Sequence, residues 1–254
     1  MALAINKLLD EIPMRRRYLI ALYAILATSV QFAMAASSTH VFIDNNELNY
    51  VGSLSQEANR QAFALFDSLP EKPAILSIRS KGGPTDAGME LGRWVHANGI
   101  TVKVMEYCFS SCANYVFTAA PRKVVSNFAV VGYHGGLSST SFTLDSGQEA
   151  GLMSLPAAQR EIARAKLEQS IRESIAPQVE AERAFFSLIG VQQRITTLGQ
   201  ASNAMRNASA KSIGWTFSVA DFAKLGVRHI RVVNPPWQPG FVNTDTAITV
   251  LAVD

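Results

Sequence analysis

The chain has 254 residues, of which 48% are hydrophobic and 17% are charged. This composition is that of a folded globular protein and excludes a disordered or collagen-like chain, and the length suffices for one large domain with a full core. Residues 1–35 carry four of the 23 basic and two of the 20 acidic side chains, which leaves 19 basic and 18 acidic groups. A chain this close to neutral has no electrostatic basis for binding nucleic acid, and we expect no such partner.

The N-terminal segment has the pattern of an export signal. Three arginines at 15–17 precede an apolar run from Tyr18 to about Ala33, and the sequence Ala33-Met34-Ala35 has the small-x-small form of a cleavage site. An uncleaved anchor that holds the protein on a membrane is the alternative, because the run is near the shortest length that spans a bilayer. In either case we expect residues 36–254 to form a domain that is periplasmic or secreted.

Strand-like and helix-like patterns alternate after the export signal. Alternation at this interval favours an α/β domain with a mostly parallel sheet. Asn45-Asn46 is expected to be the turn of a hairpin, and the glycines at 82 and 83 are expected to form a turn before a helix. The expected elements are a strand or hairpin over 40–52, a helix over 53–69, a strand over 73–80, a helix within 81–100, a strand over 101–107, a short helix over 111–120 and a strand within 123–134.

The next segment, about 150–205, has a helical pattern that we interpret as an insert, covering the sheet or packing on a neighbouring subunit. Pro177 is expected to end one helix there, and a second is expected from 178 to 190. Beyond the insert, 219–233 predicts a short helix, a glycine stop and a strand, and 246–253 is rich in β-forming residues.

Both cysteines of the chain, Cys108 and Cys112, flank two serines where a strand pattern gives way to a helix pattern, in "VMEYCFSSCANYVF". Disulfides persist outside the cytoplasm, so we expect these two residues to form a bridge. Two sulfurs without a nearby histidine cluster do not make a zinc site, and we expect no metal. The idea that Cys112 is itself a nucleophile is weaker, because an oxidising compartment would bridge it.

A strand, a sharp corner with a small nucleophile and then a helix suit acyl transfer. The helix N-terminus offers free backbone N–H groups to an oxyanion, and the glycine loop in "SKGGPTDAG" can offer another because glycine allows close backbone approach. The general base is expected to be His134, which follows a strand and precedes two glycines in "VVGYHGG". The other histidines, which lie in less distinctive settings, are His40, His96 and His229.

These segments together resemble the Clp-type serine peptidases of the Clp/crotonase fold, and in particular their exported members. "SKGGPTDAGM" is similar to the family's "SPGG…AGM" segment, "SSCANYVFTAA" to its nucleophile helix, "VVGYHGG" to its strand ending in histidine and "FSVADFAKLGV" to its "FLSAxEAxEYGLV" element. The resemblance covers roughly residues 41–137 and 215–233. It implies repeated strand–helix units around a mostly parallel sheet, and a homo-oligomer assembled through peripheral helices.

The same resemblance implies an extracytoplasmic serine hydrolase that acts on peptides or proteins without a cofactor. The register of the nucleophile helix points to Ser111 and not to Ser110, with His134 as its base. The oxyanion would then be bound by the backbone N–H groups of Gly83 and Cys112. A Cys108–Cys112 bridge would fix the geometry of the corner.

The sequence departs from the family at the acid of the triad. The family's register places that residue on Gly214, and no acidic residue occurs from Asn203 to Val219. A Ser–Lys dyad with Lys81 is a weaker alternative, since that side chain is expected to face solvent. The carboxylates that could replace the acid, none of which the sequence favours, are Asp145, Glu149, Glu180 and Glu182.

Two further classes of function are compatible with the same motifs. A non-catalytic binding or assembly module would keep the fold and lose the chemistry, and the missing acid supports it. A crotonase-type enzyme acting on acyl thioesters would use the same two-donor oxyanion hole. An exported protein would rarely meet coenzyme A, so the expected compartment nearly excludes this second class.

Overall fold

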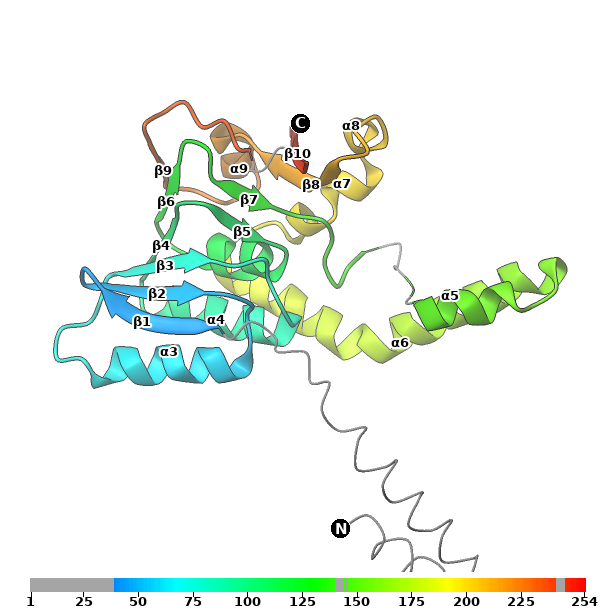
Figure 1. Ribbon diagram of the computed structural model, residues 1–254, viewed down its shortest axis with the longest axis horizontal. Coiled ribbons are helices and arrows are strands. Elements are labelled where there is room, and N and C mark those ends of the chain that lie inside the picture. The colour runs from blue at the N-terminus through cyan, green and yellow to red at the C-terminus, as the bar shows by residue number, and fades with distance from the viewer. Residues whose placement is uncertain (1–38, 140–143, 145, 241–244) are drawn as a thin grey trace, which may run out of the picture. The chain divides into compact units, whose positions relative to one another are not determined.

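A six-stranded sheet forms the centre of the computed structural model (Figure 1), which describes residues 39–139, 144, 146–240 and 245–254. The export segment predicted over 1–35 lies outside the described residues. The first two strands pair antiparallel and all other neighbours in this sheet run parallel, which confirms the predicted α/β class. In spatial order the strands are β1 (His40–Asp44), β2 (Glu47–Val51), β3 (Ile75–Arg79), β4 (Thr101–Val104), β6 (Lys123–Ser126) and β9 (Ile230–Val233).

The hairpin between β1 and β2 turns at Asn45 and Asn46, whose φ angles are 49° and 58°. Asparagine tolerates this left-handed backbone better than other non-glycine residues, and a two-residue turn with positive φ at both positions matches the twist of the strands. The register that follows pairs Asp44 with Glu47. It places Leu48 and Tyr50 of β2 in the core.

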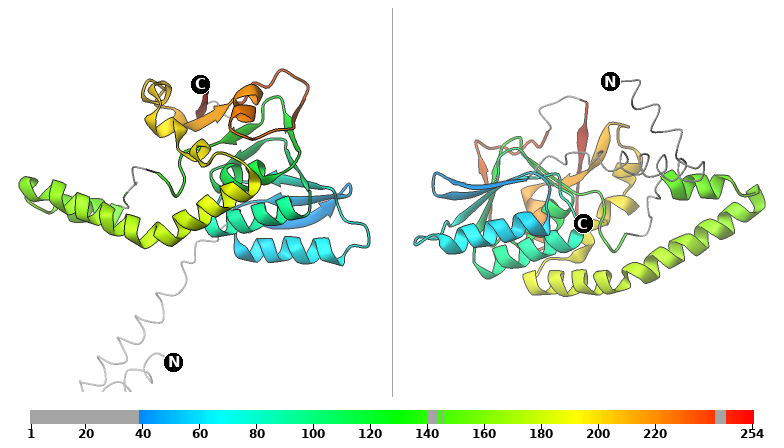
Figure 2. Two further views of the ribbon diagram at one scale, coloured as in Figure 1. Left: turned by 180° about the vertical axis from the view of Figure 1, so that it is seen from behind. Right: turned by 60° about the horizontal axis from the view of Figure 1, so that its bottom comes forward.

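Two amphipathic helices, α3 (Gln56–Ser68) and α4 (Thr85–Ala97), lie on the same side of this sheet (Figures 1 and 2). The first begins where the Ser55 side chain accepts a hydrogen bond from the Ala58 N–H, an N-cap that satisfies one of the free donors of a helix start. The second follows the glycine loop and ends before Gly99, whose φ is 64°. This helix contacts the helix that carries the predicted nucleophile.

Two small parallel pairs of strands adjoin the main sheet and surround the predicted site. β5 (Tyr107–Phe109) pairs with β7 (Val130–Gly132), and β8 (Ser212–Phe217) pairs with β10 (Ala247–Leu251). An isolated bridge between Tyr133 and Trp215 joins the two pairs. Immediately after β5 the chain enters η1 (Cys112–Phe117), a π-helix, and such helices occur frequently at functional sites.

The remaining helices follow β7, and α6 (Ala157–Ile189) differs from the prediction because it runs through Pro177 without ending. The proline leaves the carbonyl of Glu173 without its helical partner. Both residues are exposed, so water can satisfy that carbonyl. Among the described residues no helix, α6 included, is apolar enough over enough length to cross a membrane. The other helices are α5 (Ser146–Met153), η2 (Gln193–Thr196), α7 (Leu198–Ala201), α8 (Asn203–Arg206) and α9 (Val219–Lys224).

Candidate active site

Ser110 lies at the sharp corner between β5 and η1. Its φ angle is 57°, a left-handed conformation that is uncommon for a residue with a Cβ atom and that recurs at functional sites. Its N–H donates to the Gly132 carbonyl of β7 at 2.9 Å, and its carbonyl accepts from the Asn114 N–H at 2.8 Å. Backbone hydrogen bonds on both sides therefore hold this serine at the tip of a strand–turn–helix unit, an arrangement that exposes a nucleophile.

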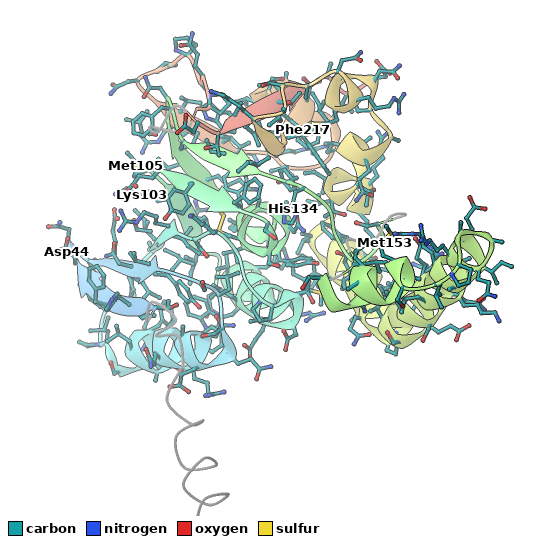
Figure 3. The ribbon with its side chains drawn as sticks, turned by 45° about the vertical axis from the view of Figure 1, so that its right-hand side comes forward. Asp44, Lys103, Met105, His134, Met153 and Phe217 are labelled. Carbon is teal, nitrogen blue, oxygen red and sulfur yellow. A yellow bond between two sulfur atoms is a disulfide. The ribbon has the colours of Figure 1, made fainter. Side chains whose placement is uncertain are left out.

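His134, labelled in Figure 3, meets this serine from the end of β7. Its Nε2 atom lies 2.8 Å from the Ser110 Oγ atom, within the range of a nucleophile–base hydrogen bond. Desolvation at this site lowers the pKa of the His134 imidazole below its ordinary value of 6.5, since partial burial disfavours the charged form. The imidazole is therefore biased towards the neutral form that can accept a proton.

The predicted pairing of His134 with Ser111 is not formed. The Ser111 hydroxyl donates to the Gly83 carbonyl at 2.7 Å, and Ser111 is only 3% exposed. Ser110 is the turn residue between β5 and the helix, and Ser111 already has helical backbone angles, with φ −55° and ψ −26°. Its side chain consequently points back to the glycine loop, and the residue beside the histidine is the serine that precedes it.

The glycine loop packs directly against this corner. Gly82 has φ 99°, and a Cβ atom there would lie 2.8 Å from both the Phe109 carbonyl oxygen and the Ser110 Cβ atom. A Cβ atom at Gly83 would lie 2.3 Å from the Leu54 carbonyl oxygen. The loop can approach Ser110 only because Gly82 lacks a side chain, and Gly83 has no room for one against Leu54. Lys81, the alternative base, is exposed.

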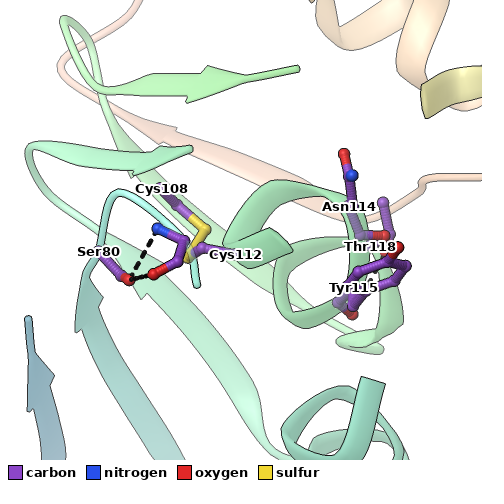
Figure 4. The surroundings of a disulfide bond; sticks show 7 residues. Ser80, Cys108, Cys112, Asn114, Tyr115 and Thr118 are labelled. Carbon is purple, nitrogen blue, oxygen red and sulfur yellow. Dashed lines mark hydrogen bonds between the residues drawn. A yellow bond between two sulfur atoms is a disulfide. The ribbon is translucent and has the colours of Figure 1, made fainter. Parts of the chain in front are cut away.

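The predicted disulfide between Cys108 and Cys112 is confirmed (Figure 4), and Ser110 lies in the short loop of sequence that it closes. Both cysteines are fully buried. The bridge joins β5 to the first residue of η1, and Cys112 has no free thiol that could act as a nucleophile. Among the residues that the structure describes, no three histidine, cysteine, aspartate or glutamate side chains are grouped as a metal site would require.

A cavity of about 620 Å³ opens beside the Ser110–His134 pair, a size typical of small-molecule and peptide side-chain pockets. Its wall includes apolar side chains as well as hydroxyl and amide groups, and Arg206 contributes a charged guanidinium. The lining residues are Gly83, Thr85, Ser110, Ser111, Asn114, His134, Gly135, Gly136, Leu137, Ser139, Gly199, Gln200, Met205, Arg206 and Trp215.

Asn114 is a site residue that the sequence analysis missed. Its Nδ2 atom donates to the Gly135 carbonyl at 2.8 Å, and so it fixes the residue that follows the histidine. Its Oδ1 atom is buried and accepts no hydrogen bond from the described residues. The available sequence signal was an amide side chain within the predicted short helix over 111–120, four residues after Ser110.

Glu182 of α6 fixes the rest of the segment after His134. Its carboxylate is fully buried and accepts hydrogen bonds from the Tyr115 hydroxyl at 2.7 Å, the Ser138 hydroxyl at 2.8 Å and the Gln193 amide at 2.8 Å. Burial and this carboxylate raise the pKa of the Tyr115 phenol well above its ordinary value. The network ties η1, the segment after His134 and η2 to one helix.

No carboxylate contacts His134 within the described part of the chain. Of the four candidate acids, Glu149 pairs with Arg164 and Glu180 with Arg183 on the surface, Glu182 lies in the network above, and Asp145 lies outside the described residues. At the family's acid position, a Cβ atom on Gly214 would lie 2.1 Å from the Tyr133 carbonyl oxygen. This backbone position therefore excludes any side chain.

The sequence matches no protein-family profile and no curated protein. Similar solved structures include an enoyl-CoA hydratase from Thermoplasma volcanium GSS1 (9% identity, 36% of this chain and 49% of that chain, TM-score 0.27). They also include an enoyl-CoA hydratase from Mycobacterium avium subsp. paratuberculosis K-10 (13%, 67% and 90%, 0.29) and a membrane-bound stomatin-specific protease (11%, 81% and 96%, 0.36). The match spans about half the length of the first of these. All three TM-scores lie below 0.5, and the α/β assignment comes from this chain's own strand order.

Proposed function

We propose that this domain is a serine peptidase of the Clp/crotonase type, with Ser110 as the nucleophile and His134 as the general base. The observation that supports this most directly is the 2.8 Å contact between Ser110 Oγ and His134 Nε2 at a left-handed corner beside a cavity. A nucleophile held against a neutral imidazole, with backbone N–H groups next to it, is the arrangement that acyl transfer requires.

In the proposed reaction His134 Nε2 takes the hydroxyl proton while Ser110 Oγ attacks the carbonyl carbon of a peptide bond. His134 then returns the proton to the leaving amine, and a water molecule hydrolyses the acyl-enzyme by the same exchange. With Ser110 as nucleophile, the adjacent N–H donor becomes that of Ser111, in place of the predicted Cys112. We assign the oxyanion hole to the N–H groups of Gly83 and Ser111, at about 3 kcal/mol per donor.

The proposed compartment is outside the cytoplasm, and the proposed substrates are peptides or proteins. The disulfide supports the compartment, because a bridge between the only two cysteines persists where conditions are oxidising. The basic and apolar pattern of residues 1–35 supports it independently. Self-assembly into a homo-oligomer is proposed on the family resemblance.

A non-catalytic binding or assembly module is the second candidate. The observation in its favour is that no carboxylate of the described residues orients His134. Loss of the orienting acid from a triad costs around ten-thousandfold in turnover elsewhere. The two candidates therefore differ in whether Ser110 is nucleophilic, which can be measured without knowing the substrate.

The experiment is fluorophosphonate labelling of the purified, oxidised full chain, alongside Ser110→Ala, Ser111→Ala and His134→Ala. We expect labelling of the wild type and of Ser111→Ala, and none of the other two variants. Ser111→Ala is the matched control because it removes the same hydroxyl one residue away. Labelling lost in Ser111→Ala and kept in Ser110→Ala would restore the original assignment. A folded, oxidised wild type that does not label would favour the binding module.

A further inference from the structure

The ring of Phe109 lies flat against the ring of His134. Their centroids are 5.2 Å apart and their planes differ by 3°. Phe109 is the last residue of β5 and immediately precedes Ser110, so one strand end carries both the serine and the surface on which its histidine lies. A parallel, offset arrangement of this kind is a favourable geometry for two aromatic rings.

Two glycines leave the space that the Phe109 ring occupies. Gly132 is its direct partner in the β5–β7 ladder, and a Cβ atom there would lie 2.3 Å from the ring's Cδ2 atom and 2.5 Å from its Cε2 atom. A Cβ atom at Gly214 would lie 3.2 Å from the Cζ atom. An aromatic side chain that covers glycine in this way stabilises a strand pair. The ring fits here only because both positions lack side chains, and so it has little freedom to move.

We propose that Phe109 is a positioning residue that sets the plane of the His134 imidazole, so that Nε2 faces the Ser110 hydroxyl. This role rests on the proposed chemistry of the Ser110–His134 pair. In a triad an acid holds the imidazole through its second ring nitrogen. Here Gly214, at the position that the resemblance assigns to the acid, instead leaves space for the tip of the Phe109 ring. The stacking of this ring on His134 then orients the imidazole in place of the acid.

A phenyl ring orients the imidazole without supplying the full negative charge of a carboxylate. The protonated imidazole therefore gains little compensation for its desolvation, whereas a buried carboxylate would stabilise it strongly. This arrangement agrees with the lowered pKa of His134. Replacing Phe109 should accordingly reduce the rate through loss of orientation, and the pH dependence should shift because the surroundings of the imidazole change.

The test compares Phe109→Leu with Phe117→Leu in the full chain. Phe117 lies in η1, is fully buried and contacts Phe222, not His134, so the same substitution there reports packing loss alone. Two quantities are measured: the fluorophosphonate labelling rate against pH, and the NMR shifts of the His134 ring protons. We expect Phe109→Leu to lower the labelling rate about 10- to 100-fold, because the imidazole is no longer aligned with the serine. The variant should also abolish the shift that the Phe109 ring current causes in the His134 ring protons. Phe117→Leu should change neither quantity.

The outcomes separate this role from the proposed function. If the wild type labels, and folded Phe109→Leu labels at the same rate with the same pH profile, the positioning role alone is overturned. A large loss of rate in Asp145→Asn, with Phe109→Leu unaffected, would assign the orienting task to that carboxylate. A wild type that does not label would overturn the proposed function and, with it, this role.

Discussion

Ser110 and Ser111 carry the same hydroxyl group, and the backbone gives each a different partner. At φ 57° the first serine points to His134, and at φ −55° the second points to the Gly83 carbonyl. The left-handed corner costs about 1–3 kcal/mol, a strain that the neighbouring ladder and the disulfide hold in place. The partner of each serine hydroxyl at this corner is therefore set by backbone conformation as much as by residue type.

At the residue scale we predict that the labelling rate depends on pH through His134. Desolvation at the site lowers the pKa of this imidazole from its ordinary value of 6.5, so the neutral base persists to lower pH than in an unperturbed histidine. The rate should be constant at neutral pH and fall as the pH drops through this lowered pKa. Measuring the rate from pH 5 to 8 gives the midpoint, which should lie below 6.5.

The same shift has a consequence for folding. Because the folded-state pKa lies below the unfolded one, the contribution of His134 to the free energy of unfolding is present above pH 6.5 and decreases as the pH falls.

A midpoint of the labelling rate above pH 6.5 would contradict the lowered pKa and would indicate a carboxylate beside the imidazole. For the pH dependence of unfolding, His134→Asn supplies the control, since it removes the titrating group.

At the scale of elements, one helix residue connects segments that are far apart in sequence. Glu182 accepts hydrogen bonds from Tyr115, Ser138 and Gln193, and these come from η1, from the segment after His134 and from η2. A buried carboxylate is stable only when donors surround it. The helical segment that the sequence suggested as an insert thus participates in the geometry of the site.

We predict that Glu182→Gln lowers the free energy of unfolding by about 1–3 kcal/mol, because its amide group would face donors where the carboxylate accepts. Urea denaturation measures the change. The matched control is Glu180→Gln, two residues earlier in α6, whose exposed pair with Arg183 should contribute under about 1 kcal/mol. Equal effects of the two substitutions would show that the buried network does not stabilise the fold.

The sequence was sufficient to predict the elements whose cause is local. Period-2 and period-3.6 hydrophobic patterns, the Asn45-Asn46 turn and the glycine turn at 82 and 83 follow from residue type, and so does the position of His134 at a strand end. The disulfide was predictable because only two cysteines exist. These signals lie within a few residues of the feature that they predict.

The remaining features depend on contacts between distant segments or on a single dihedral angle. Which of two adjacent serines lies beside His134 depends on the φ angle of Ser110, and the register of the nucleophile helix pointed instead to Ser111, which contacts the Gly83 carbonyl. The space for the Phe109 ring is left by glycines at 132 and 214, which no short motif contains. The uninterrupted α6 shows that the cost of Pro177 is tolerated where solvent can satisfy the carbonyl left without a partner.

At the scale of the whole molecule we predict that the disulfide stabilises the fold and supports the reaction. Closing a five-residue loop contributes about 2 kcal/mol in the chain-entropy model, and the bridge also holds the corner on both sides of Ser110. Reduction of the wild type should lower both the melting temperature and the labelling rate. Scanning calorimetry and labelling, each with and without reductant, provide the two measurements.

The double variant Cys108→Ala/Cys112→Ala is the control for that prediction. It should behave like the reduced wild type and show no response to reductant. If the oxidised and reduced wild type melt and label alike, the bridge has no role in either property. The double variant also removes thiols that could exchange in the reduced state.

The last strand has a consequence for the biosynthesis of the protein. β10 pairs with β8, and β8 in turn bridges Tyr133, the residue before His134. A ribosome makes residues 247–251 after every other strand described above, so β8 lacks one of its neighbours until those residues have been made. A nascent chain therefore carries its serine, its histidine and both cysteines before it has the support that aligns them. Under the proposed function, this order leaves the serine–histidine pair without the β8–β10 support until residues 247–251 have been made.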